Sequence, residues 1–174
     1  MDELLAQPTR RRIFDVVSAH PGASAREVQR LAGLAWGETA YHLEQLTSAG
    51  VLRRERGGRR DYYFPATMTW EDRRLLQALR SPAQRALLLL LSERPGLTLA
   101  ELREVAGFSL STTSFHLRQL LDRAVVEMYR EGNARRYRVV RPERVAELVR
   151  GYRTSFEDRL VDRFVETWSG LLGR

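Results

Sequence analysis

Two stretches of twelve residues, AWGETAYHLEQL at 35–46 and SLSTTSFHLRQL at 109–120, share one pattern. Thr, His, Leu, Gln and Leu recur at the same places in both, and apolar residues follow at three- and four-residue steps. Such spacing predicts that each stretch is an amphipathic helix. The stretches lie 74 residues apart, and their similarity extends well beyond either one.

A duplicated domain accounts for this similarity. Residues 8–65 match residues 82–139 without a gap, and 17 of the 58 aligned positions are identical. Identity at this level over one fixed offset indicates an internal repeat. Each copy has the same order of predicted elements: a first helix, a short second helix, a third helix and two strands around a turn.

Local signals mark the ends of these elements. The first helices begin near Pro8 and Pro82, since proline is tolerated in a first helical turn. The second helices begin with capping boxes, in which a hydroxyl residue is followed three positions later by an acid, and they end at a glycine. These signals are Ser24-x-x-Glu27 with Gly33, and Thr98-x-x-Glu101 with Gly107.

Each copy ends in a basic hairpin. The stretches VLRRERGGRRDYYF at 51–64 and VVEMYREGNARRYRVV at 125–140 combine a glycine turn with alternating aromatic residues. Helix, short helix, helix and basic hairpin is the order of a winged helix-turn-helix domain. The sequence therefore predicts a mainly α fold with small β-hairpin wings (α+β), built from two tandem winged helix-turn-helix domains.

Four segments follow from this interpretation. We expect a first domain at 1–66, a linker helix at 67–81, a second domain at 82–140 and a C-terminal helical segment at 141–174. The linker helix is expected to hold the two domains as a rigid pseudo-dimer. The C-terminal segment is expected to be broken near Gly151. The last segment has an apolar stripe longer than a winged helix needs, which favours pairing with the same helix of a second chain; packing back over its own domains is the alternative. The residues expected to dimerise are Tyr152, Phe156, Leu160, Phe164, Trp168 and Leu171.

Composition narrows the class of partner. The net charge is +7, and all 29 basic residues are arginine, which suits bidentate contacts to phosphate and guanine. Arginine-rich codon usage explains the absence of lysine equally well. The chain has no cysteine, no signal-peptide pattern at its start, and no apolar run longer than ALLLLL at 86–91, too short to cross a bilayer. We expect a cytoplasmic, nucleoid-associated protein.

Both copies resemble the arsenic-repressor-like (ArsR) winged-helix regulators of bacteria and archaea. The resemblance is carried by LAQPTRRRI at 5–13 as a first-helix signature, SLSTTSFHL at 109–117 as a recognition-helix signature, and RRERGGRRDYY at 53–63 as a hairpin. Many members sense metals through cysteines, or through His and Asp pairs in the last helix. The corresponding segments here lack those ligands, so metal sensing is disfavoured, while the tandem arrangement resembles two-domain regulators common in archaea.

The third helix and the hairpin of each copy are the expected DNA-binding elements, because they meet the major groove and the phosphate backbone respectively. The candidate recognition-helix residues are Ser109, Ser111, Thr112, Thr113, Ser114, His116, Arg118 and Gln119 in copy two, and Trp36, Thr39, Tyr41, His42 and Gln45 in copy one. The candidate wing residues are Arg54, Arg56, Arg59, Arg60, Arg130, Asn133, Arg135 and Arg136. An N-cap role for Ser109, inward packing of Thr113 and a solvated charged turn for each wing are the structural alternatives.

The two copies differ in charge along the third helix. Residues 36–48 carry two acids and no arginine, whereas residues 109–123 carry two arginines and one acid. Both wings, 53–61 and 130–138, have a net charge of +3. The second copy is therefore expected to be the stronger DNA reader.

No catalytic, metal or cofactor site is predicted. The matched pair His42 and His116 lacks a consistently placed carboxylate or nucleophile, and metal-ligand spacing is absent, so no enzyme is expected. The sequence favours a sequence-specific transcription regulator that binds double-stranded DNA as a homodimer. A chromatin-like architectural protein and a protein–protein adaptor are the alternatives. The operator, the sign of regulation and any small-molecule effector stay open.

Overall fold

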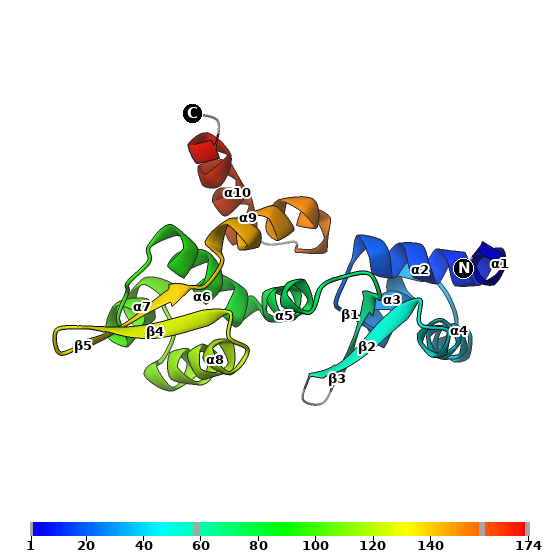
Figure 1. The fold of residues 1–174 in the computed structure, drawn as a ribbon, viewed down its shortest axis with the longest axis horizontal. Helices are drawn as coiled ribbons and strands as arrows, with labels where there is room; N and C mark the ends of the chain where they lie inside the picture. The colour runs from blue at the N-terminus through cyan, green and yellow to red at the C-terminus, as the bar shows by residue number, and fades with distance from the viewer. Residues whose placement is uncertain (1, 58–59, 157–158, 173–174) are drawn as a thin grey trace. The chain divides into compact units, whose positions relative to one another are not determined.

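The computed structural model describes residues 2–57, 60–156 and 159–172, which form two compact units, Met1–Gln77 and Ala78–Arg174. Each unit is built around three helices and an antiparallel hairpin (Figure 1). This arrangement confirms the predicted mainly α fold with small β wings, present twice in tandem. Within the described residues, no helix is long and apolar enough to span a bilayer.

Unit 1 contains a three-stranded antiparallel sheet beside its helices, with strand order β1-β3-β2. The short strand β1 was not predicted; it pairs Ala23 with Tyr63 and joins the loop before α3 to the wing. The elements are α1 (Asp2–Leu5), α2 (Pro8–Ala19), β1 (Ala23–Ser24), α3 (Ala25–Ala32), α4 (Trp36–Ser48), β2 (Leu52–Gly57), β3 (Arg60–Pro65) and α5 (Trp70–Leu79).

Unit 2 repeats this order and adds a C-terminal helical segment. In place of β1, an isolated bridge joins Leu97 to Tyr137. The elements are α6 (Pro82–Glu93), α7 (Leu99–Ala106), α8 (Leu110–Asp122), β4 (Val126–Glu131), β5 (Ala134–Val139), α9 (Pro142–Gly151), the 3-10 turn Arg153–Ser155 and α10 (Arg159–Leu172).

Both predicted capping boxes are confirmed. In unit 1 the backbone N–H of Ser24 donates to the Glu27 carboxylate at 2.8 Å, and the Ser24 hydroxyl accepts from the Glu27 N–H at 3.3 Å. Thr98 and Glu101 make the same reciprocal bonds in unit 2. Each box satisfies N–H groups that the first turn of a helix leaves without partners. The boxes therefore fix where α3 and α7 begin.

The repeat extends further toward the N-terminus than the aligned segment suggests. The Arg11 guanidinium donates to the Leu5 carbonyl at 3.2 Å, and Arg85 donates to the Leu79 carbonyl at 2.6 Å. Both pairs are separated by six residues, so α1 and the last turn of α5 hold corresponding places in their units. The boundary between the two compact units falls after Gln77, inside α5, which lies within the segment predicted as a linker helix.

The two cores are built from corresponding apolar positions of the three helices. All of the following side chains are at most 1% exposed, apart from Leu117 at 3%: Ile13, Val17, Val28, Leu43 and Leu46 in unit 1, and Leu87, Leu91, Leu102, Leu117 and Leu120 in unit 2. Burial of one face of each helix supplies most of the stabilisation available to so small a domain.

The C-terminal segment explains why α6 contains a run of leucines. Helix α10 packs against α6 and α9, and Val161 and Phe164 are fully or almost fully buried. Leu89 of α6 lies in this region and is 3% exposed, whereas the corresponding residue of unit 1 is the exposed Asp15. Helix α6 is therefore apolar on two faces because α10 covers the outer one.

This packing bears on the residues expected to dimerise. Phe156 and Phe164 are buried within their own unit, with the guanidinium groups of Arg80 and Arg85 within 5.7 Å of the Phe156 ring. Tyr152 and Trp168 are half-buried, and Leu160 is 37% exposed. The Leu171 side chain lies outside the described residues. Part of the segment thus packs on its own unit, while pairing of the exposed positions with a second chain stays a prediction.

Replacing Phe164 with Ala should destabilise unit 2 by about 3–5 kcal/mol, because a fully buried aromatic side chain leaves a cavity. Urea unfolding followed by circular dichroism measures this change. Leu160→Ala, at a surface position, should cost less than about 1 kcal/mol. A midpoint of the wild-type protein that rises with protein concentration would instead mean that the segment is buried between chains.

Ala124 follows α8 with a left-handed backbone, φ +53°, where unit 1 has Gly50 at φ +69°. Left-handed geometry costs a residue with a Cβ about 1–2 kcal/mol, partly offset by the greater chain entropy that glycine loses. Ala124→Gly should therefore stabilise unit 2 by about 0.5–1 kcal/mol in the same unfolding experiment. The reciprocal Gly50→Ala should destabilise unit 1; opposite signs would contradict the interpretation.

Candidate nucleic-acid interface

Helices α4 and α8 are held with one face in the core and the other in solvent. In α4, Leu43 and Leu46 are buried and the Thr39 hydroxyl donates to the Ala35 carbonyl at 2.9 Å. In α8, Thr113 makes the same bond to the Ser109 carbonyl. The solvent face of each helix then carries an aromatic ring, Tyr41 at 60% exposure and Phe115 at 59%.

Three candidate contact residues are placed inside instead. Thr39 and Thr113 are 0% exposed and their hydroxyls are already bonded, and His42 is buried against its neighbour Tyr41. The expectation that these side chains reach DNA was wrong, because the helical period turns them toward the core. His116 is half-buried beside Phe115.

The first turn of α8 presents a cluster of hydroxyl groups. Ser109 is the N-cap, and its hydroxyl accepts from the Thr112 N–H at 3.1 Å. The same hydroxyl lies 3.0 Å from that of Ser111 and 2.8 Å from that of Thr112, while Ser114 is half-buried. Backbone N–H groups and hydroxyls at a helix N-terminus are suited to an anion such as a phosphate.

Gln119 takes part in a polar network that fixes α8 to α6. The amide of Gln84, itself 5% exposed, donates to the Gln119 side-chain oxygen at 2.6 Å. Arg123 donates to the Gln84 side-chain oxygen at 3.2 Å and to the Gln119 carbonyl at 3.4 Å. Gln119 thus positions the helix, whereas the corresponding Gln45 of unit 1 is exposed.

The wing of unit 2 places two arginines opposite each other. Arg130 of β4 and Arg135 of β5 are cross-strand partners near the tip, and both are exposed. Like charges in this position repel each other. Within the described residues neither one has an acidic partner, and the turn residue Asn133 is exposed beside them.

Arg136 differs from these two arginines. It donates to the Gly96 carbonyl at 2.7 Å and lies 2.5 Å from a Glu131 carboxylate oxygen. Arg138 is likewise paired with Glu127 at 2.6 Å. Side chains alternate along a strand, so these pairs belong to the other face of the hairpin from Arg130 and Arg135. Arg136 is therefore a structural residue that ties the wing to the domain.

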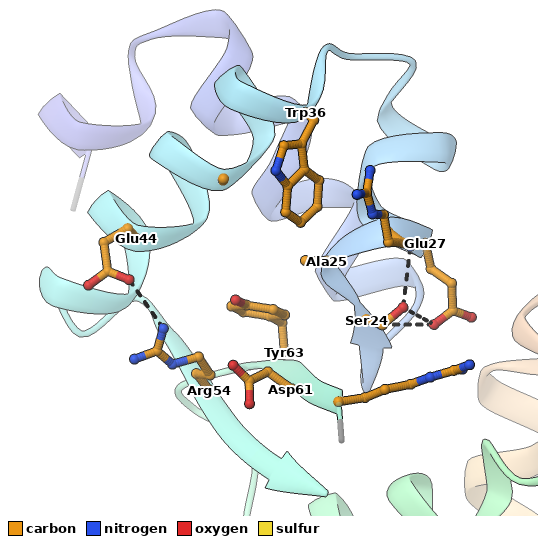
Figure 2. Close-up of a pocket in the computed structure, with 11 residues that line it drawn as sticks. Ser24, Ala25, Glu27, Trp36, Glu44, Arg54, Asp61 and Tyr63 are labelled. Carbon is orange, nitrogen blue, oxygen red and sulfur yellow. Dashed lines mark hydrogen bonds and ion pairs between the residues drawn. The ribbon is translucent and has the colours of Figure 1, made fainter. Parts of the chain in front are cut away.

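In unit 1 a groove of about 580 Å³ separates α4 from the wing. Figure 2 shows Trp36 and Glu44 of α4 facing Arg54, Asp61 and Tyr63 of the hairpin across it. The Arg54 guanidinium lies 3.3 Å from the Glu44 carboxylate. Burial raises the pKa of the Tyr63 phenol, although the adjacent Arg54 opposes this effect, so the ring is neutral at physiological pH.

Other charges of unit 1 are also paired. Arg56 of β2 is the cross-strand partner of Asp61 of β3, with 3.9 Å between guanidinium and carboxylate. The guanidinium of Arg26 stacks on the Trp36 ring, 3.9 Å from its centroid. Arg60 is exposed, and Arg59 lies outside the described residues.

The repeat allows the surfaces formed by the third helix and the wing of each unit to be compared position by position. At four corresponding positions, unit 1 has two acids and two arginines, so their charges cancel, whereas unit 2 has three arginines and no acid. At these four corresponding positions unit 1 carries Glu44, Arg54, Arg56 and Asp61, and unit 2 carries Arg118, Met128, Arg130 and Arg135. Both wings have the same net charge of +3, and this number hides the difference because it does not depend on which charges face each other.

Phe115 was not among the sequence candidates. It aligns with Tyr41, and two matched aromatic residues on an amphipathic helix are more typical of a core. Their common exposure, at 59% and 60%, places them on the outer face of the helix instead. Within the described residues, no group of His, Asp and Glu side chains could hold a metal ion.

Comparisons with known proteins agree with this architecture. A family model described as an N-terminal HTH domain matches residues 7–76, and one described as a helix-turn-helix domain matches residues 73–129. The chain therefore contains two helix-turn-helix domains in tandem, and the two matches meet within α5.

One curated relative is described as an uncharacterized HTH-type transcriptional regulator of Methanocaldococcus jannaschii. It is 27% identical over 135 residues, which are 76% of this chain and 33% of the relative. The chain thus spans about a third of the length of that protein.

Two solved structures are also similar in part. One is a predicted DNA-binding transcriptional regulator from E. coli, 29% identical with a TM-score of 0.40, covering 44% of this chain and 80% of that one. The other is the DIP2311 protein from Corynebacterium diphtheriae, 19% identical with a TM-score of 0.32, covering 76% and 26%.

Thr98→Ala should raise the pKa of Glu101. The backbone N–H and the hydroxyl of Thr98 bond to this carboxylate and hold its pKa below the usual range, with a smaller effect from Arg136. Because the folded-state pKa is depressed, the stabilisation is complete above the unfolded-state pKa and is lost as the pH falls through the folded-state value. Carbon-13 NMR titration of the glutamate carboxyls measures the shift. Thr98→Ser, which keeps a hydroxyl, should leave the pKa low; an equal rise in both variants would contradict this account.

Proposed function

We propose that the protein is a transcription regulator that binds specific sites on double-stranded DNA, and that unit 2 supplies its main DNA-binding surface. Two helix-turn-helix domains and a relative described as a transcriptional regulator support this class of function. Helix α8 would lie in the major groove and the wing along the phosphate backbone.

The observation that carries the proposal is the cross-strand pair of Arg130 and Arg135. Two guanidinium groups held opposite each other repel, and neither has a carboxylate partner within the described residues. A phosphate between or beside them removes this repulsion and gains charge-assisted hydrogen bonds. Arg118 adds a third cation on the solvent face of α8.

The start of α8 supplies the complementary polar contacts. The hydroxyls of Ser111 and Thr112, which lie beside the Ser109 hydroxyl at the helix N-terminus, can bond a phosphate or a base edge. The exposed Phe115 ring is apolar and lies one turn further, where a thymine methyl group would offer an apolar contact. Arginines would thus provide affinity and the helix would provide sequence readout.

Neutralising the three arginines should weaken DNA binding strongly. For Arg118→Gln/Arg130→Gln/Arg135→Gln we expect the slope of log affinity against log salt to fall by about three, roughly one for each lost phosphate contact. Fluorescence anisotropy with a labelled duplex over a salt series measures both affinity and slope.

A matched variant separates position from net charge. Arg138, Arg144 and Arg153 also belong to unit 2, and each is paired with an acid, Glu127, Glu147 and Asp162 respectively. Changing these three to Gln removes the same charge, yet should lower the slope by less than about one. Equal losses in the two triple variants would contradict a defined DNA-binding surface.

Specificity requires a second comparison. Affinity for the DNA upstream of the protein's own gene should exceed that for a random duplex by about a thousandfold at physiological salt. Equal affinities that fall together with salt would indicate an architectural DNA-binding protein. No binding to either duplex would favour a protein–protein adaptor.

A further inference from the structure

The two winged helices differ most where DNA would approach. Glu44 of α4 and Asp61 of β3 line the groove of unit 1 (Figure 2). Glu44 lies 3.3 Å from the guanidinium of Arg54, and Asp61 lies 3.9 Å from that of Arg56. The repeat places Arg118 and Arg135 at the positions of these two acids in unit 2. Both differences reverse the sign of the charge.

Stability does not account for the two acids. The Glu44 and Arg54 side chains are 59% and 46% exposed, and the Arg56 side chain is 90% exposed with 3.9 Å to its partner. Exposed ion pairs of this kind contribute little to folding, because water and salt screen them and the side chains lose rotational freedom. The core and caps of unit 1 also do not depend on them.

We propose that Glu44 and Asp61 determine which of the two winged helices binds DNA. Their carboxylates pair with Arg54 and Arg56, two cations of the unit 1 wing that would otherwise meet phosphates, and they repel the DNA backbone. Glu38, exposed on the same helix, adds to this repulsion where unit 2 has Thr112. The charges thus disfavour DNA binding by unit 1 and favour DNA binding by unit 2.

This inference rests on the proposed DNA-binding function of unit 2, and it changes the expected role of the unit 1 wing. The sequence predicts that Arg54 and Arg56 bind phosphates, as Arg130 is expected to do. Their pairing makes them partners of acids on their own domain. A single chain would then offer one main DNA-binding domain, and unit 1 would keep the winged-helix fold with Arg54 and Arg56 paired to acids of its own.

The test restores the charge of unit 1 in a protein whose unit 2 can no longer bind. In the background of Arg118→Gln/Arg130→Gln/Arg135→Gln, the further changes Glu44→Gln and Asp61→Asn should recover binding to a random duplex by about tenfold at low salt, as expected for two or three new phosphate contacts. Their effect should disappear when Arg54→Gln and Arg56→Gln are added.

Glu3 and Asp15 provide the matched control. Both are exposed on the first two helices of unit 1, and neither lines the groove between α4 and the wing. Glu3→Gln/Asp15→Asn changes the net charge equally and should raise affinity less than about threefold, through long-range attraction alone. Thermal unfolding of every variant confirms that unit 1 stays folded.

Three results would overturn the inference: equal gains from the groove pair and the control pair, no gain from the groove pair, or a clear loss when Arg54→Gln/Arg56→Gln is made in the wild-type protein. The proposed function fails separately, if the triple Gln variant of unit 2 binds DNA as well as the wild type does.

Discussion

The burial of one face of the third helix constrains everything else in each domain. Leu43 and Leu46 in α4, and Leu117 and Leu120 in α8, pack into the core of their own unit. Because these side chains recur at helical spacing, the opposite face is forced into solvent, and the strands that follow are directed alongside it. The exposed ring of Phe115 and the arginine tip of the wing owe their positions to this packing.

The two copies share the same buried positions, whereas their exposed positions differ. The core positions correspond closely between the units, and both capping boxes form with the same bonds. The exposed positions on the third helix and the wing can change, because an exposed side chain affects folding little. A carboxylate at position 44 or an arginine at position 118 is tolerated equally by the same scaffold, yet the two would act on a polyanion in opposite ways.

Much of the fold could be predicted from the sequence because its signals are local. Capping residues, terminal glycines and helical spacing placed α3, α4, α7 and α8 correctly. Features that depend on strand pairing could not be predicted from these local signals. The two-residue strand β1 has no pattern of its own, and the contact of Arg56 with Asp61 follows from hairpin register. Thr39 and Thr113 resembled contact residues by type, but the phase of the helix directs them inward.

The outer layer of unit 2 has a consequence for synthesis on the ribosome. The face of α6 that carries Leu89 is covered by α10, so it stays open to water until Val161 and Phe164 have emerged. Unit 1 has the polar Asp15 at the same place and can complete its surface as soon as its hairpin is made. The nascent chain therefore passes through a stage in which the first domain is finished and the second exposes a leucine surface. Apolar surface exposed in this way favours aggregation until it is covered.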